Sequence, residues 1–302
     1  MERRKRLSLL QPWLEARSAQ GSTDLATHNA VGKIYVTMNK DPQHFLQNNP
    51  FYDPKVLGPF CEKVDPHLAF LAYEHADGQC DEALIKVTLN NGLYHDLANY
   101  LVKKQDRGLW TRILSSERLE ECALDPASRR CLLKHVFHAV SKSRNPDEVS
   151  TTVKAFMQCD MPDELIELLE RIVLQGSDFS NNKNLQNLLI LTAIRANKEK
   201  VMEYINRLDN FDGPDIAKIA ASEQYELYEE ALTIYIKFGK KATGEEQVRY
   251  HVLAMEVIVN LIQDLERAKR FAEEVNSRPV WNKLAGAQQV AQSEVRTLPA
   301  LG

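Results

Sequence analysis

The chain has 302 residues, 44% of them hydrophobic, which is enough apolar material for one large core or two ordinary ones and excludes a disordered polar tail. Its 38 Lys and Arg residues stand against 42 Asp and Glu residues, and the net charge of -4 gives no long-range attraction to phosphate backbones. We therefore expect no nucleic-acid partner. The low counts of 12 glycines and 12 prolines, with 8% aromatic residues, favour an all-helical fold.

The five cysteines, at positions 61, 80, 122, 131 and 159, form no CxxC pair, a usage typical of reduced thiols in the cytosol. The apolar stretch after the basic residues Arg3 to Arg6 is too short for a signal peptide. The strongest apolar run, Leu185 to Ile194, has half the length of a membrane span, which needs about 20 residues. We expect a soluble, cytoplasmic protein and interpret the basic start as solubilising charge.

Proline repeatedly follows a residue that can cap a helix. The five pairs are Asp41-Pro42, Asp53-Pro54, Asp65-Pro66, Asp125-Pro126 and Asn145-Pro146. Asp or Asn accepts a backbone hydrogen bond at the cap, while Pro at the first helical position lacks only an N–H group that the helix leaves without a partner. Each pair predicts a helix start, and Glu148 adds an acidic residue in capping-box spacing after Asn145.

Between these starts the apolar residues recur with the period of an α-helix. Pro162 to Leu174 is apolar on more than one face, which predicts a helix buried on two sides, and Asn184 to Ala196 predicts an inner helix around Leu189. Tyr225 to Phe238 is amphipathic. Its predicted water-facing residues are Glu226, Glu229, Glu230 and Lys237. The chain divides into about 18 to 20 short helices of typical length, with no alternating strand pattern.

An internal repeat emerges when the sequence is shifted by 148 residues. The shift lays Pro66, Leu68, Ala69, Leu71 and Ala72 on Pro214, Ile216, Ala217, Ile219 and Ala220, and Glu82 to Leu84 on Glu230 to Leu232. Both copies set alanines beside larger aliphatic residues, as two closely packed helices do. Each helical hairpin can bury its apolar side only against its neighbours, so the repeat predicts a stack of hairpins.

Several segments resemble the leg of the clathrin heavy chain. They are Leu9 to Arg17, Thr27 to Ala30, Asn49 to Asp53, Cys61 to Ala69, Glu148 to Met157 and Pro162 to Ala220, the last with the runs NLLILTAI and VMEYINRLDN. The resemblance covers most of residues 7–288 and implies a right-handed α-solenoid, or α-zigzag, of stacked helical hairpins from about the distal part of the leg. It implies one repeat block over residues 1–145, a second over residues 146–290 and a divergent tail over residues 291–302.

The resemblance also implies a function. A clathrin leg is a structural strut of vesicle coats, which implies a non-enzymatic role in endocytosis and vesicle-mediated protein transport, at the cytoplasmic face of coated pits and coated vesicles. Other heavy-chain legs would be the partners, clathrin light chain would bind only through regions absent here, and membrane contact would be peripheral, through the coat. Because the β-propeller and trimerisation hub of the family are not in this sequence, we interpret the chain as a fragment or truncated copy.

An alternative function stays open. Vacuolar sorting subunits share the clathrin-type repeat, and a stack of hairpins can serve as a peptide-binding or tethering scaffold. A concave groove lined with aromatic residues would favour that function, and the sequence displays no such pattern.

One cluster of residues has the chemistry of a zinc site. It comprises Cys122, Cys131, His135 and His138. The last three share a helical face, but eight residues separate the two cysteines and no second pair of ligands follows. We expect an ordinary amphipathic helix there, with no metal and no cofactor.

No other pattern predicts catalysis. The sequence contains no G-x-S-x-G, P-loop, Rossmann or zinc-protease motif. His28, His44 and His67 fall near predicted helix starts or turns, where surface or capping roles are ordinary. Adjacent acidic residues such as Asp163 and Glu164 point in different directions around a helix, which is typical of a solvated face. We therefore expect no catalytic residue and no enzymatic activity.

Overall fold

The structure is a computed structural model that describes residues 7–114 and 125–297. These residues form helices joined by short turns, and no β-strand occurs among them. Internal contacts divide the chain into two compact units, Met1–Cys159 and Asp160–Gly302. The all-helical prediction is confirmed, and the eighteen α-helices of the described residues lie within the expected number.

The first unit begins with a 3-10 turn at Leu7–Leu10, followed by ten α-helices over its described residues. They are α1 (Gln11–Ala19), α2 (Leu25–Met38), α3 (Pro42–Asn48), α4 (Pro54–Cys61), α5 (Pro66–Glu74), α6 (Asp81–Asn90), α7 (Tyr94–Lys104), α8 (Arg107–Leu114), α9 (Pro126–Lys142) and α10 (Pro146–Gln158).

The second unit holds eight α-helices in its described part. They are α11 (Pro162–Leu174), α12 (Lys183–Ala196), α13 (Val201–Arg207), α14 (Gly213–Ala220), α15 (Tyr228–Lys241), α16 (Gly244–Glu256), α17 (Leu265–Val275) and α18 (Arg278–Thr297). A 3-10 turn at Lys198–Lys200 precedes α13, and a π-helical segment at Val257–Ile262 extends α16.

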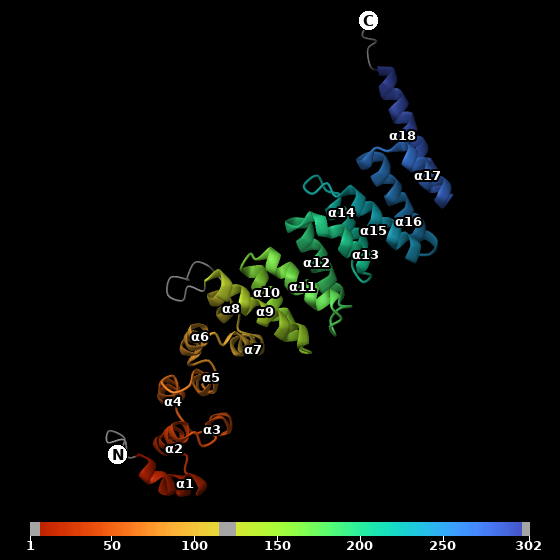
Figure 1. Cartoon of the computed structure of the whole chain (residues 1–302). Helices are drawn as coiled ribbons and strands as arrows, with labels where there is room; N and C mark the ends of the chain where they lie inside the picture. The colour runs from red at the N-terminus through yellow and green to blue at the C-terminus, as the bar shows by residue number, and fades with distance from the viewer. Residues whose placement is uncertain (1–6, 115–124, 298–302) are drawn as a thin grey trace. The chain divides into compact units, whose positions relative to one another are not determined.

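Within each unit the helices pack on their neighbours along the chain (Figure 1). In the first unit α1 packs on α2, α2 on α3 and α4, α3 on α5, α4 on α5, α5 on α6, and α6 on α7. Short helices of this kind cover their apolar sides only by contact with the next ones, which is the packing of an α-solenoid. Sequential pairing is thus confirmed, while the predicted right-handed zigzag stays a prediction.

The second unit repeats this order of contacts, and the repeat corrects the predicted register. Here α11 packs on α12, α12 on α13 and α14, α13 on α15, α14 on α15, α15 on α16, and α16 on α17. Helices α11 to α17 therefore match α1 to α7 in their order of contacts, so that α14 matches α4. The shift of 148 residues instead laid α5 on α14, which is wrong by one helix. Neighbouring helices share the same apolar period, so the shifted register also aligns apolar with apolar residues.

Four of the five predicted proline caps are confirmed. Asp53, Asp65, Asp125 and Asn145 each accept a hydrogen bond from a backbone N–H in the first turn of the helix that follows. At the fifth position α3 begins at Pro42 as predicted, but Asp41 is left-handed, with φ of 45°, and makes no side-chain cap. Glu148 accepts from the hydroxyl of Ser143 at 2.5 Å.

The individual helix predictions have mixed outcomes. Helix α11 has the predicted bounds, and Leu189 on α12 is completely buried. Helix α15 begins at Tyr228, three residues later than predicted. Glu229 is exposed as predicted, and its carboxylate also accepts two hydrogen bonds from Arg267 of α17, at 2.5 and 2.8 Å. The prediction that Lys237 faces water is wrong, for a reason given below.

The repeat blocks stay a prediction. The contact-based division falls after α10 because α10 packs on α7, α8 and α9, whereas the predicted block boundary lies at residues 145 and 146. The basic residues Arg3 to Arg6, Cys122 and residues 298–302 of the predicted tail lie outside the described residues. Among the helices that are described, none is both long enough and apolar enough to cross a membrane.

The burial of Leu189 generates a prediction about stability. The substitution Leu189→Asp places a carboxylate without a partner among apolar side chains and should cost several kcal/mol, about 3 to 5, enough to unfold the surrounding helices. Circular dichroism melting measures the loss. Asn184→Asp adds the same charge at an exposed site of the same helix and should leave the melt unchanged. Equal melting of wild type and Leu189→Asp would contradict the inner position of α12.

Candidate functional site

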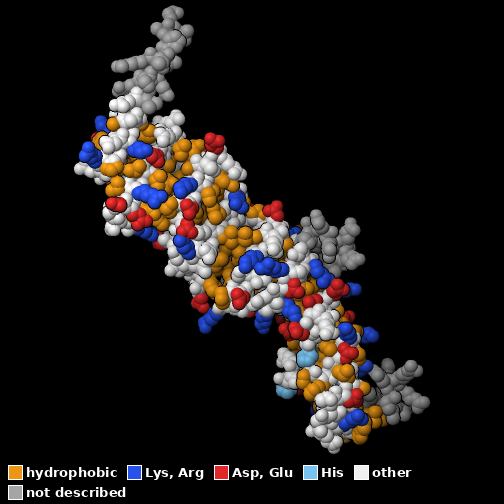
Figure 2. Space-filling view, turned by 180° about the vertical axis from the view of Figure 1, so that it is seen from behind, with side chains coloured by type: hydrophobic (Ala, Val, Ile, Leu, Met, Phe, Trp, Pro, Cys, Tyr) orange, Lys and Arg blue, Asp and Glu red, His pale blue; other side chains and the backbone are white. Residues whose placement is uncertain are grey.

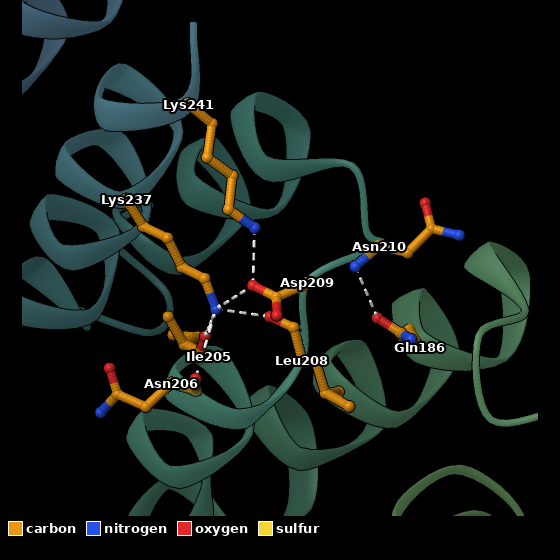
Figure 3. A network of polar contacts seen from close by, with 8 residues as sticks. All are labelled: Gln186, Ile205, Asn206, Leu208, Asp209, Asn210, Lys237 and Lys241. Carbon is orange, nitrogen blue, oxygen red and sulfur yellow. Dashed lines mark hydrogen bonds and ion pairs between the residues drawn. The ribbon is translucent and has the colours of Figure 1, made fainter.

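A set of polar contacts in the second unit joins the turn before α12, the first turns of α12 and the loop before α14. We call Ser180, Gln186, Asn187, Asn210 and Asp212 the second polar bridge. Gln186 donates from Nε2 to the carbonyl of Ser180 at 2.8 Å. Its Oε1 accepts from the N–H of Asn210 at 2.9 Å (Figure 3). Asn187 Oδ1 accepts from the N–H of Asp212 at 2.8 Å. Since Gln186 is only 4% exposed, its amide replaces water as the partner of two loop backbone groups.

The first unit has the same arrangement around α2. We call Ser22, His28, Asn29, Asn49 and Asp53 the first polar bridge. His28 Nε2 lies 2.6 Å from the carbonyl oxygen of Ser22, and Nδ1 lies 2.9 Å from Nδ2 of Asn49. Asn29 Oδ1 accepts from the N–H of Asp53 at 2.8 Å. Because a carbonyl oxygen only accepts, Nε2 of His28 carries the ring proton and Nδ1 accepts from the Asn49 amide.

The two bridges occupy equivalent positions of the internal repeat. The matching residues are Ser22 and Ser180, His28 and Gln186, Asn29 and Asn187, and Asp53 and Asp212, separated by 158, 158, 158 and 159 residues. The helix caps agree, because Asp24 caps α2 and Asn182 caps α12 through their side chains. The hydrogen bonds therefore give the same repeat register as the helix contacts. The separation between matching residues rises from 158 on the helices to 159 at the loop aspartates, so the second unit has one additional residue between these two positions.

His28 corrects a second prediction. It was expected at a surface or capping position, but it is 3% exposed inside α2 and both of its ring nitrogens have partners. His44 on α3 and His67 on α5 are exposed, and His67 Nδ1 lies 3.4 Å from the carboxylate of Asp96. The buried ring links the carbonyl of Ser22 to the side chain of Asn49. His28 therefore has a structural role.

The C-terminal turn of α13 is closed by Lys237 from α15, which Figure 3 shows reaching down to it. Lys237 Nζ donates to the carbonyl groups of Ile205, Asn206 and Leu208 at 2.7, 3.3 and 2.5 Å. These carbonyls have no partner within the helix and form the negative end of its dipole, so a cation is favoured there. The side chain of Lys237 is only 17% exposed, which overturns the prediction that it faces water.

The first unit satisfies the matching carbonyl by a different group. Leu46, at the end of α3, precedes Ile205 by 159 residues, and its carbonyl accepts from the hydroxyl of Tyr52 at 2.9 Å. The ring of Tyr52 stacks on His75 with 4.8 Å between centroids. Lys237 Nζ in turn lies 5.8 Å from the ring centroid of Phe211, the counterpart of Tyr52. The two units therefore place a hydrogen-bond donor at the same backbone carbonyl, but the donor is a tyrosine hydroxyl in the first unit and a lysine ammonium in the second.

Asp212 of the second polar bridge and the nearby Asp209 each form ion pairs with lysines. Hydrogen bonds from Lys241 and Lys237 lower the pKa of the Asp209 carboxyl, and those from Lys183 and Asn187 lower the pKa of Asp212. A lowered folded-state pKa stabilises the fold above the ordinary value of 3.8, and this contribution is lost as the pH falls through the folded-state value. These carboxylates therefore support the fold at neutral pH.

Three of the four residues with the chemistry of a zinc site lie in the described part of the chain, and Cys122 lies outside it. Cys131, His135 and His138 all lie on α9, and the His135 ring lies 5.7 Å from that of His95. No group of three or more His, Cys, Asp or Glu side chains suited to a metal ion occurs in residues 7–114 and 125–297. Burial raises the pKa of Cys61 to about 12, so this thiol stays protonated.

Sequence reasoning missed the bridge residues because their partners are distant in sequence. Gln186 and Asn187 bind loop residues 24 and 25 positions away, and Asn29 binds one 24 positions away. The signal that identifies them is a polar pair, His-Asn or Gln-Asn, four and five residues after a helix cap, with an aspartate about 24 residues further on. This pattern becomes visible only when the two units are compared in the correct register.

Comparison with models of known protein families identifies the family of this repeat. A family model named Clathrin and described as "Region in Clathrin and VPS" matches residues 1–123 and 140–294, most of the chain. The chain belongs to the clathrin repeat family. The matched part contains both polar bridges and all helices of the described residues except most of α9 and the last three residues of α18.

Clathrin heavy chains are also similar to this chain along its length. "Probable clathrin heavy chain 1" of Caenorhabditis elegans is 49% identical over 289 residues, "Clathrin heavy chain" of Drosophila melanogaster 48% over 288, and "Clathrin heavy chain 2" of Homo sapiens 49% over 288. Each alignment covers 95% of this chain and 16% of the relative. The resemblance to clathrin heavy chain is confirmed, and the chain spans about one sixth of the length of these relatives.

Exchange of the two bridging residues tests their equivalence. His28→Gln and Gln186→His each keep a donor and an acceptor at the bridge and should cost less than about 1 kcal/mol. His28→Leu and Gln186→Leu remove both and leave buried polar groups without partners, which should cost about 2 to 4 kcal/mol. Urea denaturation followed by circular dichroism measures each loss. Polar and leucine variants of equal stability would show that the bridges contribute nothing.

Proposed function

We propose that this chain is a structural segment of a clathrin heavy-chain leg, acting as a strut and as a surface for contact with other legs in a vesicle coat. The observation that carries the proposal is the similarity of about 48% to 49% to clathrin heavy chains over 95% of the chain. The place along the leg, the coat partners and the location at coated pits and vesicles are part of this proposal.

The interior of the chain suits a mechanical role. Each unit is built from helices that contact only near neighbours, and buried polar bridges hold successive helices at defined positions. Such a segment keeps its local curvature under load without a large central core. Most of the bridging contacts are hydrogen bonds to the backbone, and hydrogen bonds fix direction as well as distance.

The surface suits many weak contacts. On the face shown in Figure 2, acidic and basic side chains are interspersed with small apolar areas. Exposed ion pairs contribute at most about 1 kcal/mol each, so contacts between such surfaces form and break readily. A coat that assembles and disassembles gains its stability from the number of such contacts.

The family description names VPS proteins together with clathrin, which keeps a peptide-binding or tethering scaffold as the second candidate function. That function requires a groove that takes a peptide. Entry of the chain into coats favours the first candidate, and capture of a peptide ligand without coat entry favours the second.

Co-sedimentation with clathrin coats tests the proposed function. Purified clathrin triskelia are assembled into cages in the presence of this chain, and the cages are pelleted. We expect the chain in the pellet in proportion to the cages and in the supernatant when conditions prevent assembly. The unfolded Leu189→Asp variant should stay in the supernatant. Absence of the folded chain from the pellet at saturating concentration would contradict the proposed leg contacts.

A further inference from the structure

The register set by the polar bridges also matches α4 with α14, residue by residue. The residue before each helix, Asp53 or Asp212, fixes the separation at 159 residues. At this separation the inner sides of the two helices agree. Both helices are buried at three matching positions, which hold Leu57, Gly58 and Cys61 in α4 and Ile216, Ala217 and Ala220 in α14. The outer sides of the two helices can therefore be compared position by position.

The outer side of α4 carries an apolar stripe. We call Val56, Phe60 and Val64 the α4 stripe. The three residues are four positions apart, and backbone hydrogen bonds continue α4 through the turn that holds Val64, so all three lie on one side of the helix. Val56 is 38% and Val64 54% exposed, and Phe60 is half-buried. Figure 1 shows α4 between α2 and α6, so the stripe is exposed although helices lie on both sides of α4.

The second unit lacks this stripe. Asp215, Ile219 and Glu223 occupy the matching positions of α14 and of the turn that follows it, and all three are exposed. Because α14 forms with acidic residues at two of the three positions, the valines of the α4 stripe are not needed to build the helix or to pack it on its neighbours. Contiguous exposed apolar side chains that the fold does not need point to contact with another molecule.

Lysines flank the α4 stripe on both sides. Lys33 of α2 places its Nζ 5.7 Å from the ring centroid of Phe60, at the edge of the stripe that faces α2. Successive helix residues point about 100° apart, so Lys55 and Leu57 lie on opposite sides of the first stripe residue. Leu57 packs against Gly32 of α2, which leaves Lys55 on the far side. Both edges of the stripe are therefore positively charged.

The acidic residues of the same segment are engaged in other contacts. Asp53 and Asp65 each accept a hydrogen bond from a backbone N–H at the start of a helix. Glu62 accepts from the hydroxyl of Tyr73 on α5 at 2.5 Å. Lys63 is exposed and adds a third positive charge beside the stripe. The positive charge belongs to the first unit alone, because Lys33, Lys55 and Lys63 correspond to Leu191, Pro214 and Ser222.

We infer that the α4 stripe and its flanking lysines form a docking site for an acidic amphipathic α-helix of another protein. Residues four positions apart form a ridge of the kind that fits between the ridges of a second helix. The apolar side of that helix would cover the stripe, which is about 12 Å long, and its carboxylates would pair with the lysines on both sides. The inference does not depend on coat assembly.

Binding of two designed peptides tests the inference. The first is a fluorescein-labelled helical peptide of about 18 residues, with leucine at spacings of three and four and glutamate on its other face. The second has lysine in place of every glutamate. Fluorescence anisotropy measures the affinity of each peptide for the full chain. We expect saturable binding of the glutamate peptide that weakens as salt is added, and no binding of the lysine peptide.

The second unit supplies the variants for this test. Val56→Asp combined with Val64→Glu introduces the residues found at the matching positions of α14. This double variant should keep the circular dichroism melt of the unaltered chain and bind the glutamate peptide at least tenfold more weakly. Lys33→Gln combined with Lys55→Gln should weaken binding and reduce its dependence on salt. Ile219→Ala removes the exposed apolar side chain of α14 and should leave the affinity unchanged.

Three results would overturn the inference. They are no binding of the glutamate peptide up to millimolar concentration, equal binding of the two peptides, and full binding by the double variant Val56→Asp and Val64→Glu. Sedimentation velocity without peptide examines a second copy of the chain as the occupant. Self-association of the unaltered chain that the double variant abolishes would replace the partner protein by that second copy and so overturn the inference.

Discussion

A polar side chain on the first turns of one helix holds the backbone of a loop about 24 residues away, and the positions of the following helices depend on this contact. Asn29 binds the amide of Asp53 and Asn187 binds that of Asp212 at the same distance of 2.8 Å. Each bound aspartate begins the loop-to-helix transition before α4 or α14. Because the bonds are buried or half-buried and directional, a different crossing of these helices would leave several polar groups without partners.

The bridges also show which features of a repeat are retained when its residues change. His28 and Gln186 differ in size and shape, yet both join the preceding turn to the loop ahead. Tyr52 and Lys237 likewise satisfy the same carbonyl position at the end of α3 and α13 by unrelated groups from different places in the chain. Both units retain a hydrogen-bond partner for the same buried backbone group, although the residue that provides it differs. A buried backbone group without a partner costs free energy, whichever residue is missing.

Local signals predicted much of the fold. Proline after Asp or Asn predicted helix starts, because this pair acts within one turn, and apolar periodicity predicted the bounds of α11 and the burial of Leu189. Interactions between distant residues were not predictable in this way. Lys237 has the pattern of a surface residue until α13 is placed beside it, and Gln186 has the pattern of a polar edge until two loops close over it. The repeat register was misjudged because successive hairpins share one apolar period, and only the polar contacts distinguish one helix from the next.

Hydrogen exchange at the amides of Asp53 and Asp212, measured by NMR on the deuterated chain at neutral pH, tests the central role of the bridges most directly. If Asn29 and Asn187 hold these loops, both amides exchange as slowly as those in the middle of α2 and α12, and Asn29→Ala and Asn187→Ala each release only the amide of their own unit. Exchange of Asp53 and Asp212 at the rate of an unstructured peptide in the unaltered chain would contradict the account.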